Sequence, residues 1–104
     1  MYREPNKKVM KVYFVYILKC SDGTFYTGFT SDLLRRLGEH SLGRYSDSYT
    51  YTRRPIKLMF YLEFTNPSIA IDTKKQIKNW SQAKKVALIN GEFDKLPNLA
   101  KKRF

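Results

Sequence analysis

The sequence predicts an α/β (α+β) domain in which a small, three-stranded, mainly antiparallel sheet is flanked by about three to four helices. Residues 12–30 contain two strand-like runs around a turn, and residues 56–64 form a third apolar run. The segments that follow these runs combine helical spacing of apolar residues with capping residues. The length of 104 residues suits one domain, and the 42% of hydrophobic residues are enough to form a core.

The first predicted element is a β-hairpin. Residues 12–20, "VYFVYILKC", are nearly all apolar or aromatic, which is typical of a central strand that is covered on both faces. The turn signal "SDG" separates this run from the returning strand at residues 24–30. A three-residue loop would place Gly23 in the left-handed conformation and would fix the register of the two strands.

That register places Tyr16 opposite Gly28 and Leu18 opposite Tyr26, so both tyrosines share one face of the hairpin. Glycine weakens the interior of a strand and usually marks a close approach by another group. We therefore expect an open notch beside Tyr16 at the position of Gly28.

A first helix is expected after the hairpin, with Ser31 as its N-cap. The buried stripe of this helix would comprise Leu33, Leu34 and Leu37. The same spacing directs Arg35 and Glu39 to solvent. Arg36 and His40, four residues apart, would lie together on one flank of the stripe.

A second helix would begin with Asn66 as N-cap and Pro67 as first residue. Its buried face would comprise Ile69, Ala70, Thr73, Ile77 and Trp80. Lys74 falls on the border of this face. Ser81 would cap a third helix, which Gly91 would end.

Residues 43–55 form a polar, aromatic and basic loop between the first helix and the third strand. Its aromatic and basic residues are Tyr45, Tyr49, Tyr51, Arg53 and Arg54. They could clamp a nucleic-acid backbone and stack on exposed bases. Equally, the loop could be solvated, with its tyrosines packed on the sheet.

The charge of the chain points to a polyanionic partner. With 20 Lys and Arg against 9 Asp and Glu, the net charge is +11, which favours nucleic acid, DNA or RNA, over an anionic membrane surface. No stretch is long or apolar enough to span a bilayer. The many lysines of the later helices could also be ordinary solvated residues.

We expect residues 1–10 to form a disordered basic lead-in, residues 11–97 the folded domain, and residues 98–104 a basic tail. The N-terminus is too polar for a signal peptide. A single cysteine, Cys20, excludes an internal disulfide and suits a reducing, cytoplasmic setting. A single histidine, His40, excludes zinc motifs that need two histidines. We expect a monomer.

The order of these motifs resembles the GIY-YIG endonuclease superfamily, and most closely its small, stand-alone branch, which is similar to the N-terminal domain of the excision-repair nuclease. "FVY" and "YTG" stand at the two signature triplets, and Arg36 and His40 match the helical R-x-x-x-H spacing. Further matches are the "YT…RRP" loop at 49–55, "EF" at 63–64 and "A…QIK" at 70–78. The resemblance covers residues 11–97 and implies the GIY-YIG fold.

The resemblance also implies a catalytic site for hydrolysis of DNA phosphodiesters with Mg²⁺ or Mn²⁺, in a setting such as DNA repair. Tyr16 would orient or deprotonate the nucleophile, and Tyr26 would hydrogen-bond the phosphate or the water. Arg36 would stabilise the charge that develops on the phosphate, and His40 would assist proton transfer or hold the phosphate. Gly28 would leave room for the DNA backbone. Further contacts to the substrate would come from Tyr49, Arg53 and Arg54.

One position departs from the family pattern, because Lys74 stands where the family has its metal-binding glutamate. A lysine ammonium has no acceptor lone pair, so it cannot ligate the cation, although it can bind a phosphate. Glu63 or Asp72 would have to replace the missing ligand, and Asp72 points roughly 160° away from Lys74 around the helix. We therefore expect DNA binding with impaired cleavage.

Two alternatives stay open at this point. The chain could be an active, structure-selective endonuclease with a relocated carboxylate ligand. It could also be a non-catalytic module whose basic face binds RNA or an acidic protein.

Overall fold

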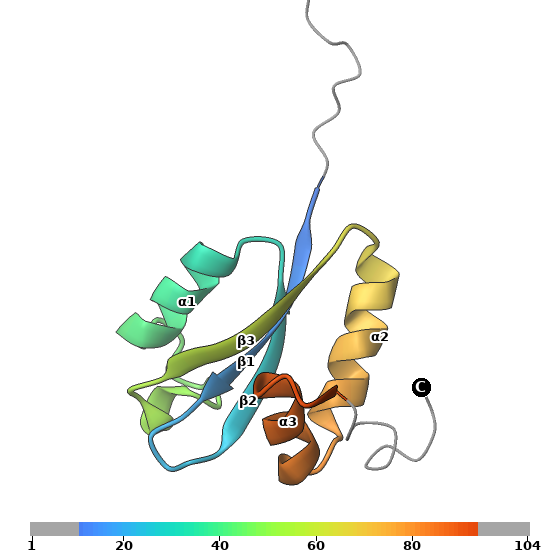
Figure 1. Ribbon diagram of the computed structural model, residues 1–104. Helices are drawn as coiled ribbons and strands as arrows, with labels where there is room; N and C mark the ends of the chain where they lie inside the picture. Colours follow the sequence, from blue (N-terminus) through green and yellow to red (C-terminus); the bar gives the residue numbers. More distant parts are fainter. Residues whose placement is uncertain (1–10, 94–104) are drawn as a thin grey trace, which may run out of the picture.

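The computed structural model describes residues 11–93, which form a three-stranded antiparallel sheet with helices on both faces (Figure 1). The strands are β1 (Tyr13–Lys19), β2 (Phe25–Thr30) and β3 (Lys57–Phe64), in the order β2-β1-β3. This arrangement confirms the predicted α+β class and the central position of the first strand. The expected segments 1–10 and 98–104, and the domain boundary at residue 97, lie outside the described residues.

The register of the hairpin is the one that the sequence predicts. Tyr16 pairs with Gly28 and Leu18 pairs with Tyr26. Gly23 adopts the left-handed conformation, with φ of 86°, and its N–H donates to the Cys20 carbonyl oxygen at 3.0 Å.

The two faces of the sheet have separate apolar clusters. Helices α2 (Pro67–Lys78) and α3 (Gln82–Ile89) cover the face that carries Val15 and Ile17. Helix α1 (Leu33–Leu42) covers the other face, where Leu33 packs with Tyr16 and Leu18. Figure 1 shows α1 on one side of the sheet and α2 on the other.

Two of the three predicted N-caps are confirmed. The Asn66 side chain accepts from the N–H of Ser68, and the Ser81 side chain accepts from the N–H of Lys84. For α1 the prediction is wrong by one residue, because the cap is Asp32 and not Ser31.

The Asp32 carboxylate accepts from the Arg35 N–H at 3.2 Å. The Thr30 hydroxyl in turn accepts from the Asp32 N–H at 3.1 Å. These bonds fix the start of α1 one residue later than Ser31.

Three burial predictions are wrong. Leu34 is 82% exposed, because α1 turns Leu33 and Leu37, and not Leu34, toward the sheet. Ile69 is 54% exposed, because Ala70 is the residue that faces the core at that turn of α2. Glu39 is buried rather than solvated, and its charge is paired with two arginines of its own helix.

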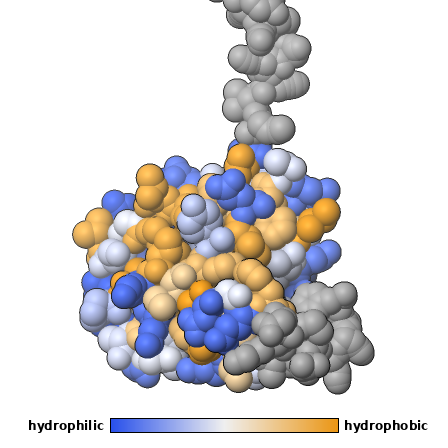
Figure 2. Space-filling model, in the orientation of Figure 1, coloured by the Kyte–Doolittle hydropathy of each residue, from blue (hydrophilic) through white to orange (hydrophobic). Residues whose placement is uncertain are grey.

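The surface over α1 and β3 remains partly apolar, and Figure 2 shows hydrophobic and hydrophilic residues mixed on this side of the molecule. Leu34, Leu42 and Tyr61 are exposed there. In the part of the chain from 11 to 93, no helix has the length and hydropathy needed to cross a membrane.

Candidate functional site

Gly28 is required by the side chain of Tyr16. A Cβ atom at position 28 would overlap the Cζ and Oη atoms of Tyr16 and would lie 2.8 Å from its Cε1. The notch expected beside Tyr16 is therefore filled by the phenol ring itself. Gly28 acts on the site through Tyr16, and its contact with DNA stays a prediction.

The hydroxyl of Tyr16 begins a buried chain of hydrogen bonds. It lies 3.0 Å from His40 Nε2, and His40 Nδ1 lies 2.8 Å from Thr50 Oγ1. Tyr16, His40 and Thr50 are all buried. Arg36 beside the phenol has only donors, whereas Nε2 of a neutral His40 can accept, so we assign the Tyr16 proton to the hydrogen bond with His40 Nε2. His40 then carries its own proton on Nδ1 and donates it to Thr50.

Burial favours the neutral forms of both Tyr16 and His40. Desolvation raises the pKa of Tyr16 well above its usual range, and the neighbouring Tyr26 adds to the rise, while Arg36 opposes it. Desolvation also lowers the pKa of His40, and the positive charge of Arg36 lowers it further, against the opposing effect of Glu39. At neutral pH the pair is a neutral phenol and a neutral imidazole. The neutral imidazole has a free nitrogen lone pair and is the proton acceptor of the two, although its lowered pKa makes it a weaker base than a solvated histidine.

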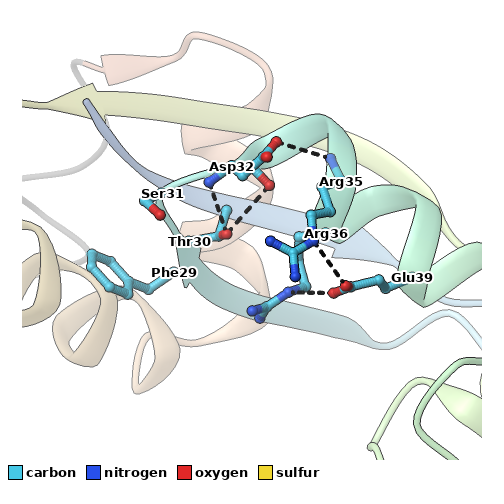
Figure 3. A pocket seen from close by; sticks show the side chains of 7 residues that line it. All are labelled: Phe29, Thr30, Ser31, Asp32, Arg35, Arg36 and Glu39. Carbon is cyan, nitrogen blue, oxygen red and sulfur yellow. Dashed lines mark hydrogen bonds and ion pairs between the residues drawn. The ribbon is translucent and has the colours of Figure 1, made fainter. Parts of the chain in front are cut away.

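Arg36 and Arg35 converge on Glu39 (Figure 3). Arg36 Nε lies 3.1 Å from one carboxylate oxygen, and Arg35 Nε lies 3.3 Å from the other. These residues border a hollow of about 260 Å³ at the end of β2, which Thr30 and Asp32 also line. A guanidinium has five N–H donors, so Arg36 retains donors for an anion in this hollow while Glu39 holds its Nε.

The loop after α1 closes over Tyr26. The Tyr49 ring stacks on the Tyr26 ring with centroids 6.0 Å apart, and the Tyr49 hydroxyl donates to Thr24 Oγ1 at 3.0 Å. The Arg53 guanidinium lies 3.9 Å from the Tyr49 ring centroid, and its Nε lies 3.1 Å from an Asp22 carboxylate oxygen. Tyr49 and Arg53 are thus anchored to the hairpin, in keeping with a loop whose tyrosines pack on the sheet.

Arg54 belongs to a different set of contacts. Its guanidinium lies 4.7 Å from the Tyr51 ring centroid, and its Nε donates to the Tyr51 carbonyl at 2.9 Å. It also lies beside Gly43, where an added Cβ would meet the guanidinium carbon at 2.6 Å. These contacts join Arg54 to its own loop and to the end of α1.

The comparison with known families decides the identity of the fold. The model of the GIY-YIG catalytic domain matches residues 12–87. The chain belongs to the GIY-YIG family.

Relatives of this GIY-YIG domain are small proteins of similar length. A UPF0213 protein from Syntrophus aciditrophicus is 45% identical over 76 residues, which cover 73% of this chain and 87% of that protein. A UPF0213 protein from Staphylococcus aureus is 39% identical over 80 residues, which cover 77% of this chain and 96% of that protein. The solution NMR structure of a UPF0213 protein from Bacillus halodurans matches with 35% identity and a TM-score of 0.51, over 76% of this chain and 83% of that one. The predicted resemblance to a small, stand-alone GIY-YIG branch is confirmed.

GIY-YIG nucleases are generally metal-dependent, but Lys74, at the position of the family's metal ligand, does not fit a divalent cation. Lys74 lies half-buried on α2 and has no lone pair to give. Glu39 is already held by two arginines. Within residues 11–93 no group of three or more His, Cys, Asp and Glu side chains could hold a metal ion.

The two proposed substitute ligands lie elsewhere. Glu63 is exposed on β3, where it pairs with Phe14 on the far side of β1 from Tyr26. It lines a separate hollow of about 470 Å³ with apolar residues of α1 and β3. Asp72 is exposed on α2.

Sequence reasoning missed two polar residues of this GIY-YIG site. Thr50 lies between two tyrosines of the loop, and no local signal in the sequence pairs it with His40. Glu39 is predicted to face solvent, although its spacing of three and four residues from Arg36 and Arg35 is that of helical ion pairs.

Proposed function

We propose that this GIY-YIG domain binds DNA over the surface that Tyr26, Arg36 and Tyr49 surround, and that it cleaves phosphodiesters weakly or not at all. Family membership implies a nucleic-acid substrate. The net charge of +11 supports a polyanionic partner.

One observation carries the proposal. The Tyr16–His40–Thr50 chain is fully hydrogen-bonded and Arg36 stands beside it, while Lys74 occupies the position that a metal-binding glutamate has in the family. These contacts support recognition of a phosphate by this part of the site. The part that would hold a metal ion carries the opposite charge.

Each residue then has a role in binding. Arg36 donates to phosphate oxygens with the N–H groups that Glu39 leaves free. Lys74 acts on a phosphate as a point charge. Tyr16 orients the His40 ring through its hydrogen bond rather than serving as a base, because its own pKa lies far above neutral pH.

The test is a cleavage assay on supercoiled plasmid and on branched DNA, in Mg²⁺ and in Mn²⁺. Lys74→Glu is compared with the wild type and with Lys75→Glu, which makes the same charge change at an exposed neighbour on α2. We expect nicking by Lys74→Glu alone, and loss of that nicking when Arg36→Ala is added.

Binding is measured separately, by fluorescence anisotropy with labelled DNA and RNA at several salt concentrations between about 50 and 200 mM. We expect salt-dependent binding of DNA by the wild type. Robust metal-dependent cleavage by the wild type would contradict impaired catalysis and would point to a relocated carboxylate ligand. Glu63→Ala would then be the first variant tested for loss of that cleavage. RNA binding much tighter than DNA binding would contradict the DNA assignment.

A further inference from the structure

A third hollow lies across the edge strand β2, with a volume of about 240 Å³. Its lining residues are Phe25, Tyr26, Thr27, Tyr49, Lys78 and Lys85. Tyr26 is shared with the site described above, because its ring also lies edge-on to His40 with centroids 5.3 Å apart. The hollow therefore borders the proposed DNA-binding surface, with which it shares Tyr26 and Tyr49.

Two lysines from different helices meet in this hollow. Lys78 is the last residue of α2, and Lys85 lies in the middle of α3 and is half-buried. Burial lowers the pKa of Lys85, and the positive charge of Lys78 lowers it further. Among residues 11–93, no ion pair joins either ammonium group to a carboxylate.

The neighbouring Lys84 shows that this arrangement is specific to Lys85. The Lys84 side chain is buried, and its ammonium nitrogen lies 4.0 Å from the Trp80 ring centroid. The Lys84 ammonium group therefore interacts with the Trp80 ring inside the domain. Lys85, one residue later, is turned into the hollow beside Lys78.

We propose that this hollow binds a backbone phosphate of DNA between the ammonium groups of Lys78 and Lys85. Two cations held together without a carboxylate are stabilised by an anion, and a phosphate offers acceptor oxygens to both. Lys74 lies one helical turn before Lys78 on the same side of α2, so it extends the basic row along β2. This inference rests on the proposed function, because it names the lysines that would contact the DNA backbone along the edge strand β2.

The first test compares DNA binding by the Lys78→Gln/Lys85→Gln double variant and by Lys11→Gln/Lys57→Gln. The control makes the same charge change at two exposed lysines, one before β1 and one on β3 at the opposite edge of the sheet. Glutamine retains part of the aliphatic stem, which limits the loss of packing. Circular dichroism checks that both variants fold.

We expect the Lys78/Lys85 variant to bind DNA about tenfold more weakly and to flatten the slope of log K against log salt by about 1 to 2. The control should keep the slope of the wild type. Equal slopes for the two double variants, with the wild type still binding DNA, would overturn this inference and leave the proposed function standing.

The second test titrates inorganic phosphate into the wild type and follows the side-chain NMR signals of Lys78, Lys85 and Lys57. We expect the first two to shift together and Lys57 to stay. Equal shifts of all three lysines would overturn the site. If the lysine signals respond to phosphate as expected but the wild type binds no DNA, the proposed function and the proposed DNA contact both fail. A phosphate site would then remain.

Discussion

Replacing Gly28 with alanine tests the link between the hairpin and the site. The added Cβ would overlap Cζ and Oη of Tyr16. Tyr16 is fully buried, its ring lies 6.3 Å from that of Tyr26, and its hydroxyl is bonded to His40, so it has little room to move. Gly28 is not in the left-handed region, so the cost comes from steric overlap and not from the backbone.

The size of the effect follows from two opposing contributions. Alanine in a strand interior is favoured over glycine by about 0.5–1 kcal/mol. Overpacking of a filled core costs about 1–3 kcal/mol, and here the overlap involves two atoms of a buried ring. We expect Gly28→Ala to lower the free energy of unfolding by about 1–2 kcal/mol, measured by urea denaturation.

Two variants make the result interpretable. Gly38→Ala on α1 meets nothing within 4 Å, so it should raise the free energy of unfolding, by up to about 1 kcal/mol. Tyr16→Phe removes the overlapping Oη atom, so Gly28→Ala should cost less in that background, by at least about 0.5 kcal/mol. If Gly28→Ala is as stable as the wild type, the phenol does not fill the space over position 28. The glycine would then have to be explained by a bound partner.

Two further predictions concern the buried hydrogen-bond chain. Because the pKa of His40 is lowered on folding, the unfolded chain binds more protons below about pH 6.5. Stability should therefore fall as pH drops from 7 to 5, and His40→Gln should reduce this dependence; an unchanged pH profile of urea unfolding would refute it. Thr50→Val leaves the His40 Nδ1–H without its acceptor, so it should cost about 1–3 kcal/mol, whereas the exposed Thr52→Val should change stability by less than about 0.5 kcal/mol. Equal melting temperatures for the two threonine variants would contradict the assigned hydrogen bond.

The parts of the fold that depend on local signals were predictable from the sequence. The three-residue loop and the period of two give the register of Tyr16 and Gly28, because a hairpin fixes register through its turn. The caps Asn66 and Ser81 follow from side-chain chemistry within a few residues. The start of α1 was ambiguous because Ser31 and Asp32 are both good caps, and the hydroxyl of Thr30 decides between them.

The parts that depend on contacts across the fold were not predictable in the same way. Thr50 owes its role to His40, and His40 is placed by Tyr16, which is 24 residues away along the chain. Lys84 and Lys85 are identical neighbours in the sequence. Only the packing of α3 against Trp80 separates a lysine buried over a ring from one that lines a hollow.

The charges around β2 show why a lysine at position 74, in place of the family's glutamate, affects more than the metal ligand. On the α1 side, Arg35 and Arg36 share a single carboxylate, so one positive charge remains in excess. On the α2 and α3 side, Lys78 and Lys85 have no ion-pair partner within residues 11–93. A carboxylate at position 74 would offset part of this charge and attract a cation, whereas a lysine adds to it and repels one. The same residue that disfavours a metal ion therefore strengthens the attraction of this edge for a phosphate backbone, and the proposed loss of cleavage and retention of DNA binding would both follow from this one difference in charge.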